Sequence, residues 1–280
     1  VEILDSPVDA VWEEMGKEKP TIHPIWPLSD DLSGASTASK IESLRKTMKE
    51  KRTRIAVVSA LDDVAWLLNL RGGDIPYTPL FISYCVVSEK DVTLLVDIEK
   101  LSKDALHFLK ESNVSIEPYE NIKQVLESMS SSDATTDTTT TPISIWLDPL
   151  SANWHLKSIC QNLGLKIFSK STLPISLSKA IKNSIEIHSI QEAHIVDGVA
   201  LCKYFHWLEE TMKEAVIQAK ESKNEEWNGE LQLDEVDAAD QLYQFRKETS
   251  PSFIGNSFST ISSSGPNGAI VHYEPTPGNC

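Results

Sequence analysis

The residue whose setting most suggests chemistry is His272, near the C-terminal end of the 280-residue sequence. It follows the segment 265–268, Gly-Pro-Asn-Gly, in which proline fixes one φ and glycine tolerates positive φ. Strand-forming residues on both sides predict a hairpin or a bulged turn. Alternation along the second strand would place Ile270 and His272 on the same face. Spacing alone leaves two interpretations open: a histidine satisfied in the core or at an edge strand, or one presented to a ligand.

Other acids and histidines stand at spacings that could hold a cation, yet each group has a simpler explanation. His206, Glu209 and Glu210 lie one turn apart on an expected helix, where surface ion pairs are common. Asp62 and Asp63 fall where a helix is expected to begin, and the helix dipole favours negative charge there. The structural interpretation is favoured for both groups. It extends to two further pairs, His188 with Glu192 and His194 with Asp197.

The loop 71–74, Arg-Gly-Gly-Asp, is the connection in the first part of the chain that could bind an anion. Its glycines free the backbone, and an arginine can clamp a carboxylate. A helix end with a solvated arginine is the favoured alternative. The segments between strands and helices contain neither a glycine-rich nucleotide-binding motif nor a Gly-x-Ser-x-Gly nucleophile motif. This part of the chain is therefore expected to be non-catalytic.

Composition narrows the class of protein. The chain has 41 acidic and 26 basic residues, a net charge of −15, which argues against nucleic acid or an anionic membrane as a partner. No uninterrupted apolar run approaches the roughly 18 residues that cross a bilayer. The four cysteines are scattered without a C-x-x-C motif, so neither a disulfide framework nor a zinc site is indicated. A soluble protein of the cytoplasm is predicted.

Between residues 36 and 182, strand-like apolar segments alternate with amphipathic helical ones, which predicts an α/β layered domain. The expected strands are 54–59, 80–87, 92–97, 114–116, 143–147 and 165–168. A helix is expected to begin at residue 36. The next expected helix, 62–70, starts with a capping box at Ser59. Further helices are expected at 100–111, 121–129, 152–163 and 175–182. The polar segment 130–141 is expected to be an exposed loop.

The two ends of the chain do not show this alternation of strands and helices. Residues 1–34 contain a short helical segment and then an irregular stretch with three prolines, which predicts a linker. From residue 184 a single helix is expected to reach about residue 220. A charged loop at 220–230 and a second helix at 234–248 should follow.

Three separated segments resemble the cytosolic Xaa-Pro aminopeptidases (aminopeptidase P) of the creatinase/prolidase superfamily of metallopeptidases. The segments are 59–72, 193–201 and 257–273, and they occur in the order found in that family. The resemblance implies an α/β fold: a creatinase-like layered N-terminal domain at 35–182, then the first helices and hairpin of an incomplete α+β pita-bread domain at 184–280. Residues 1–34 would be a linker from a missing preceding domain, so the chain is expected to be a fragment.

The resemblance also implies an activity. Members of this family hydrolyse the N-terminal Xaa-Pro bond with two divalent ions, usually manganese, and act on peptides with proline at the second position. The catalytic residue that carries over is His272, which in the family lies beside the metals and contacts the substrate. Only seven residues follow Tyr273, none of them Asp or His. The metal ligands are therefore expected outside this chain, which alone should be inactive. A homodimer in the cytoplasm is also implied.

A second hypothesis comes from another class. The chain could be a non-catalytic protein-binding module on a peptidase-like scaffold, comparable to the peptidase-like domain of the FACT histone chaperone. The net charge of −15 would suit a basic protein partner. His272 within its complete motif favours the peptidase, because a binding module has no chemical reason to keep it.

Overall fold

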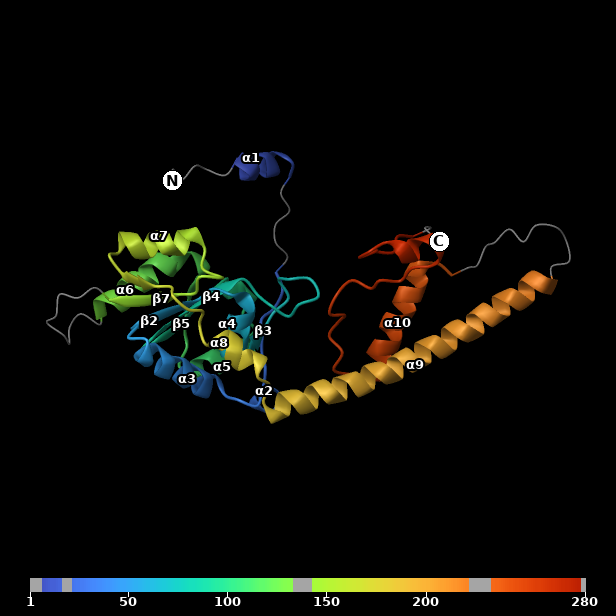
Figure 1. The fold of residues 1–280 in the computed structure, drawn as a ribbon, viewed down its shortest axis with the longest axis horizontal. Coiled ribbons are helices and arrows are strands. Elements are labelled where there is room, and N and C mark those ends of the chain that lie inside the picture. Colours follow the sequence, from blue (N-terminus) through green and yellow to red (C-terminus); the bar gives the residue numbers. More distant parts are fainter. Residues whose placement is uncertain (1–6, 17–21, 133–142, 222–232, 278–280) are drawn as a thin grey trace. The chain divides into compact units, whose positions relative to one another are not determined.

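The computed structural model describes residues 7–16, 22–132, 143–221 and 233–277. The chain forms two compact units. The first consists of Val1–Leu28, Ser36–Ile75 and Pro79–Lys179, and the second consists of Ser29–Ala35, Pro76–Thr78 and Ala180–Cys280. Figure 1 shows a sheet with helices on both sides in the first unit, and mainly helices with an irregular segment in the second.

The first unit is built on a six-stranded mixed sheet with the order β6-β5-β4-β2-β7-β8. Strand β4 pairs antiparallel with both β2 and β5, whereas the remaining pairs are parallel. All residues of β2, β4 and β5 are buried, which agrees with their continuous apolar sequence. The strands are β2 Ile55–Val58, β4 Ser83–Ser88, β5 Val92–Val96, β6 Ser115–Pro118, β7 Ser144–Leu147 and β8 Lys166–Phe168.

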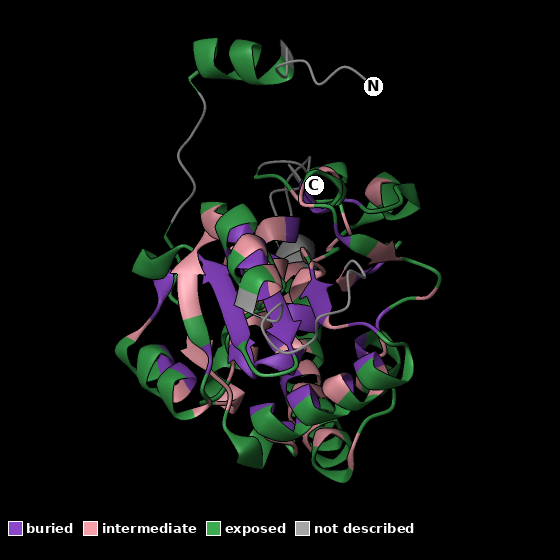
Figure 2. Cartoon of the chain, turned by 90° about the vertical axis from the view of Figure 1, so that its left-hand side faces the viewer, coloured by how far each residue is buried: buried purple, intermediate pink, exposed green. Residues whose placement is uncertain are grey.

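Helices cover both faces of this sheet (Figure 1), and its central strands are buried (Figure 2). Side chains of alternate residues divide between two cores. Ala56 and Val58 belong to one core, whereas Ile55 and Val57 belong to the other. The predicted α/β layered fold is therefore confirmed. The first core includes α3 Thr37–Glu50, α4 Leu61–Leu67, α5 Lys103–Glu111 and α8 Ile175–Ala180, and the second includes α6 Ile122–Ser132 and α7 Trp154–Asn162.

Short elements complete the first unit. The helix α1 covers Pro7–Glu14, and β1, Trp26–Pro27, pairs antiparallel with β3, Leu70–Arg71. Two 3-10 helices, η1 and η2, cover Ile98–Lys100 and Tyr119–Asn121.

Side-chain caps begin several helices of the first unit. Ser36, Ser102 and Asn153 each accept a hydrogen bond from a backbone N–H in the first turn of α3, α5 and α7. The capping box predicted at Ser59 does not form. Helix α4 instead begins after Ala60, which offers no side-chain cap, and the Ser59 hydroxyl lies 2.9 Å from that of Ser151.

The second unit is mainly helical. It contains α2 Asp30–Ser33, the long helix α9 Ser184–Glu221 and α10 Glu235–Thr249, with α9 packed against α10 and α2. The one long helix and the second helix predicted from the sequence are confirmed. Among its described residues the buried apolar side chains are Ala200, Ala238 and Tyr273. This core is small beside the two cores of the first unit.

The hairpin predicted at 257–273 is wrong. Residues 265–269 form a 3-10 helix, η4 Gly265–Ala269, and no strand occurs among the described residues after α10. Pro266 suits the first turn of such a helix because its φ is fixed and its missing N–H is not needed there. His272 adopts the left-handed conformation, with φ of 55°, which breaks the alternation that placed it beside Ile270.

Most of the predicted loops 130–141 and 220–230 lies outside the described residues, although Ser130 to Ser132 belong to α6. None of the described helices combines the length and the apolar character that a membrane crossing requires.

Candidate functional site

His272, the candidate catalytic residue, lies on the surface of the second unit. It is exposed, whereas the next residue, Tyr273, is buried with 8% of its surface accessible. The His272 imidazole makes no hydrogen bond or ion pair with the described residues. Its side chain is therefore exposed to solvent rather than satisfied in the core, and its contact with a ligand stays a prediction.

The backbone that carries His272 is tied to helix α10 by Glu235, a residue that the sequence analysis did not single out. Its carboxylate accepts hydrogen bonds from the hydroxyl of Tyr273 at 2.6 Å and from the Asn267 amide at 3.2 Å. The Ser264 N–H and hydroxyl donate to it as well. The bond from Tyr273 lowers the pKa of Glu235 and outweighs the effect of burial, so the carboxylate is charged at neutral pH.

A second polar cluster joins α9, α10 and the residues that follow α10. The Arg246 guanidinium donates to Asp197 at 2.6 and 3.4 Å and to the Asn256 side chain at 3.2 Å. Asn256 in turn donates to the Thr260 hydroxyl at 3.1 Å. The acid predicted to pair with His194 therefore pairs with an arginine across the two helices.

A cavity of about 470 Å³ opens beside this cluster, wholly within the second unit. Its wall is mostly apolar, and its ionisable residues are His194, Asp197 and Arg246. His272 is not one of the lining residues. The complete lining is Ile190, Ala193, His194, Asp197, Leu242, Arg246, Phe253, Gly255, Asn256, Ser257, Phe258, Thr260 and Ile261.

The acids beside His206 form surface ion pairs, as the favoured interpretation predicted. Lys213 lies 2.9 Å from Glu209 and 3.0 Å from Glu210. The hydrogen bond from Lys213 lowers the pKa of Glu209. These carboxylates are thus paired with a cation of their own helix.

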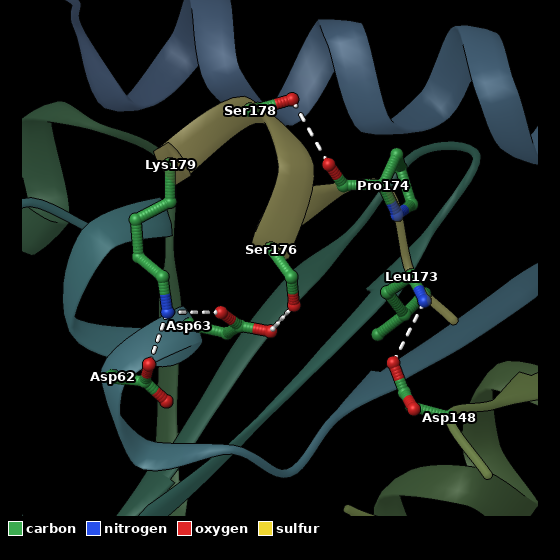
Figure 3. Close-up of polar contacts among 8 residues, drawn as sticks. All are labelled: Asp62, Asp63, Asp148, Leu173, Pro174, Ser176, Ser178 and Lys179. Carbon is green, nitrogen blue, oxygen red and sulfur yellow. Dashed lines mark hydrogen bonds and ion pairs between the residues drawn. The ribbon is translucent and has the colours of Figure 1, made fainter. Parts of the chain in front are cut away.

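Asp62 and Asp63 are also paired, with a lysine that their local sequence does not reveal (Figure 3). The Lys179 ammonium contacts both carboxylates, and the Ser176 hydroxyl donates to Asp63 at 3.2 Å. Burial raises the pKa of Asp62, but the bond from Lys179 outweighs burial and leaves the pKa lowered. This cluster joins α8 to the first turn of α4, so its role is structural.

The Arg71 loop is likewise satisfied within the first unit. The guanidinium donates to the carbonyl oxygens of Ala65 at 3.0 Å and Leu70 at 2.8 Å, so the arginine is not simply solvated. Asp74 forms an ion pair of 2.9 Å with Lys100. A Cβ added at Gly72 would lie 2.8 Å from that of Phe81, which explains the glycine by close packing.

The described residues do not fit a metal centre. No group of three or more His, Cys, Asp or Glu side chains is arranged among them to hold an ion. No chemical step is therefore assigned to a metal held by this part of the chain.

Two family models match adjacent segments of the chain. The family model of the creatinase/prolidase N-terminal domain matches residues 16–186, and that of metallopeptidase family M24 matches residues 188–280. The chain is 40% identical over 278 residues to a probable Xaa-Pro aminopeptidase P of Neurospora crassa, covering 99% of the chain and 38% of that protein. A probable Xaa-Pro aminopeptidase P of Sordaria macrospora is 39% identical over 278 residues, with 99% and 42% covered.

A solved structure agrees with this assignment. The X-prolyl aminopeptidase of Caenorhabditis elegans, described as a cytosolic enzyme with a di-nuclear active site, superposes with a TM-score of 0.81 at 29% identity. The match covers 99% of this chain and 41% of that one. The chain thus spans about two fifths of the length of these relatives. The chain belongs to the creatinase/prolidase N-terminal domain family, whose model matches residues 16–186, and its residues 188–280 are similar to metallopeptidase family M24.

Proposed function

We propose that this chain is part of a metal-dependent aminopeptidase that hydrolyses the N-terminal Xaa-Pro bond of peptides. The observation that carries the proposal is the 40% identity with a probable Xaa-Pro aminopeptidase P over 99% of the chain. Proline as the second residue lacks an amide N–H and has a fixed φ, so an enzyme needs a dedicated site to cleave before it. The substrates are accordingly peptides with proline in second position.

His272 is the catalytic residue of this chain. Its exposure and its lack of a partner among the described residues support a role in contacting the substrate beside the scissile bond. An imidazole can donate or accept a proton near neutral pH, so it can bind the peptide carbonyl or the amine that leaves. The buried Tyr273 next to it fixes the backbone from which the imidazole projects.

The metal centre belongs to sequence outside this chain. Two divalent ions, when bound, would supply an activated hydroxide and polarise the scissile carbonyl. The di-nuclear site described for the Caenorhabditis elegans enzyme supports two ions, and manganese is the proposed metal. Residues 1–280 alone should neither bind two ions tightly nor turn over.

The arrangement of the whole protein is part of the same proposal. Residues 35–182 form the creatinase-like domain, residues 184–280 open the catalytic domain, and residues 1–34 connect to a preceding domain. The described cysteines Cys85, Cys160 and Cys202 are free thiols, which suits a cytosolic location. The protein is further proposed to be a homodimer.

The decisive experiment is an assay of the full-length protein loaded with manganese. It should release the first residue of a peptide with proline in second position and leave the matching peptide with alanine there largely uncut. His272→Ala should reduce kcat/KM by a factor of about 100, in the range for loss of a positioned acid–base group. If the wild-type protein holds two ions but cleaves neither peptide, the proposed activity is refuted. The protein-binding module then becomes the better hypothesis.

A further inference from the structure

We infer that Glu235 is the positioning residue for His272: its carboxylate holds the loop from Ser264 to Tyr273 in the conformation that presents the imidazole. This inference rests on the proposed peptidase function and extends it to a residue outside the motif that carries the histidine.

The carboxylate of Glu235 is fully used by the loop. One oxygen accepts from the Ser264 N–H, from the Ser264 hydroxyl at 3.0 Å and from the Asn267 amide at 3.2 Å. The other accepts from Asn267 at 3.2 Å and from the Tyr273 hydroxyl at 2.6 Å. A carboxylate offers about four acceptor sites, so little capacity remains. Glu235 is 5% exposed and Tyr273 is 8% exposed.

These contacts fasten the loop on both sides of the 3-10 helix. Ser264 precedes η4, and Tyr273 follows it by four residues. Asn267, inside η4, also donates to the Tyr273 hydroxyl at 3.1 Å, so the two ends of the loop are linked to each other. His272 lies directly before the anchored Tyr273.

The backbone of His272 needs such support. Its φ of 55° is uncommon for a residue with a Cβ, and such a conformation persists when its surroundings determine it. The described imidazole has no bond of its own to hold it, so the direction of the side chain is set by the backbone and by Tyr273. Release of Tyr273 from Glu235 would free that backbone.

Glu235 is not needed to cap its own helix. Asp234 accepts from the N–H groups of Val236 and Asp237 at 2.8 Å each, and Asp237 accepts from the Asp234 N–H at 3.0 Å. That capping box completes the N-terminus of α10. The carboxylate one residue later is therefore committed to the loop.

The test is a double-mutant cycle in the full-length, manganese-loaded enzyme. Glu235→Ala should lower kcat for an Xaa-Pro peptide by a factor of about 100 through misplacement of His272, with little change in KM. In the His272→Ala background, the same substitution should cause almost no further loss, because both residues act through one imidazole. Glu235→Gln keeps an acceptor for Ser264 but not one for Tyr273. Its kcat should therefore lie between those of the wild type and of Glu235→Ala.

Asp240→Asn is the matched control, since it removes an exposed charge from the same helix and should leave kcat unchanged. Full activity in Glu235→Ala overturns the inference. A loss of equal size in the wild-type and His272→Ala backgrounds also overturns it, because Glu235 would then act independently of the histidine.

A second measurement separates this inference from the proposed function. In the 280-residue chain, hydrogen exchange at the Ser264 amide should accelerate by about 10-fold or more in Glu235→Ala, the effect of losing one good hydrogen bond. If the wild-type enzyme cleaves no Xaa-Pro peptide, the proposed function fails, while faster exchange at Ser264 would still support the positioning role. Unchanged exchange would refute that role whatever the activity.

Discussion

At the scale of single residues, Asp74 and Lys100 form a buried ion pair in the first unit. The two charged groups are 2.9 Å apart, and their side chains are only 4% and 8% exposed. The second oxygen of Asp74 accepts from the Ile82 N–H at 2.8 Å. The acid of the Arg-Gly-Gly-Asp loop, rather than its arginine, therefore makes the buried charge pair there.

Asp74→Asn is expected to lower the free energy of unfolding by about 3 kcal/mol, because it leaves the Lys100 ammonium buried without its counter-charge. Urea unfolding measures this change. Glu127→Gln is the control, since it breaks an exposed pair with Lys123 of 3.8 Å and should cost less than about 0.5 kcal/mol.

A further variant distinguishes the cause. Asp74→Asn combined with Lys100→Met should be less destabilising than Asp74→Asn alone, because no unpaired charge remains inside the protein. If the losses in unfolding free energy from the two substitutions simply add, packing at the two sites, rather than the uncompensated charge, determines the destabilisation.

At the scale of elements, α8 shows how side chains hold a helix that is too short to be stable alone. It has six residues, and isolated helices of that length are not stable in water. Lys179 binds the acids of α4, and the N–H of Leu173, just before α8, donates to Asp148 at 2.8 Å (Figure 3). Ile175 adds its side chain to the core.

Lys179→Met is expected to destabilise the first unit at neutral pH, and the difference from wild type should shrink in acid. The folded pKa of Asp62 lies below its ordinary value of 3.8. A lowered carboxyl pKa contributes stability that is present above the ordinary value and is lost as pH falls through the folded pKa. Urea unfolding at neutral pH and below the ordinary value checks this expectation.

Lys170→Met removes the same charge from an exposed site of the same unit and should show little effect at either pH. A destabilisation by Lys179→Met that stays constant across this pH range would assign the effect to lost packing of the lysine stem.

How far the sequence predicts an element depends on where its stabilising contacts lie. Strands β2, β4 and β5 are buried on both faces, so their continuous apolar residues identify them locally. The turn at Gly265 depends on Glu235, which is 29 residues before Ser264 and 38 before Tyr273. The residues around Gly265 alone predict a hairpin, whereas the hydrogen bonds to the distant Glu235 stabilise a 3-10 helix instead.

The same reasoning applies to the candidate site. His272 can be proposed from its motif, because the motif is contiguous in the sequence. Its left-handed backbone and its dependence on Glu235 cannot be predicted in this way, since both arise from contacts between separate elements. Lys179 was missed for the same reason: it lies 117 residues from Asp62 and 116 from Asp63.

At the scale of the whole chain, the two units have very different cores. The first buries two apolar clusters against opposite faces of its sheet. The second, within its described residues, buries only Ala200, Ala238 and Tyr273 among apolar side chains, and its polar clusters at Glu235 and Arg246 hold its segments together. Because buried apolar area is the main source of stability, the free energy of opening should differ between the units.

The 280-residue chain is therefore expected to unfold in two transitions, with the second unit opening first. Gly198→Ala should raise the first transition only: the added Cβ meets no atom within 4 Å, and alanine favours a helix over glycine by about 1 kcal/mol. Leu109→Ala should lower the second transition only, by about 2–5 kcal/mol, because Leu109 is fully buried in the first unit. Hydrogen exchange along urea titrations resolves the two. A single transition that both substitutions shift would show that the units unfold as one, and it would mean that the small core of the second unit is not what limits its stability.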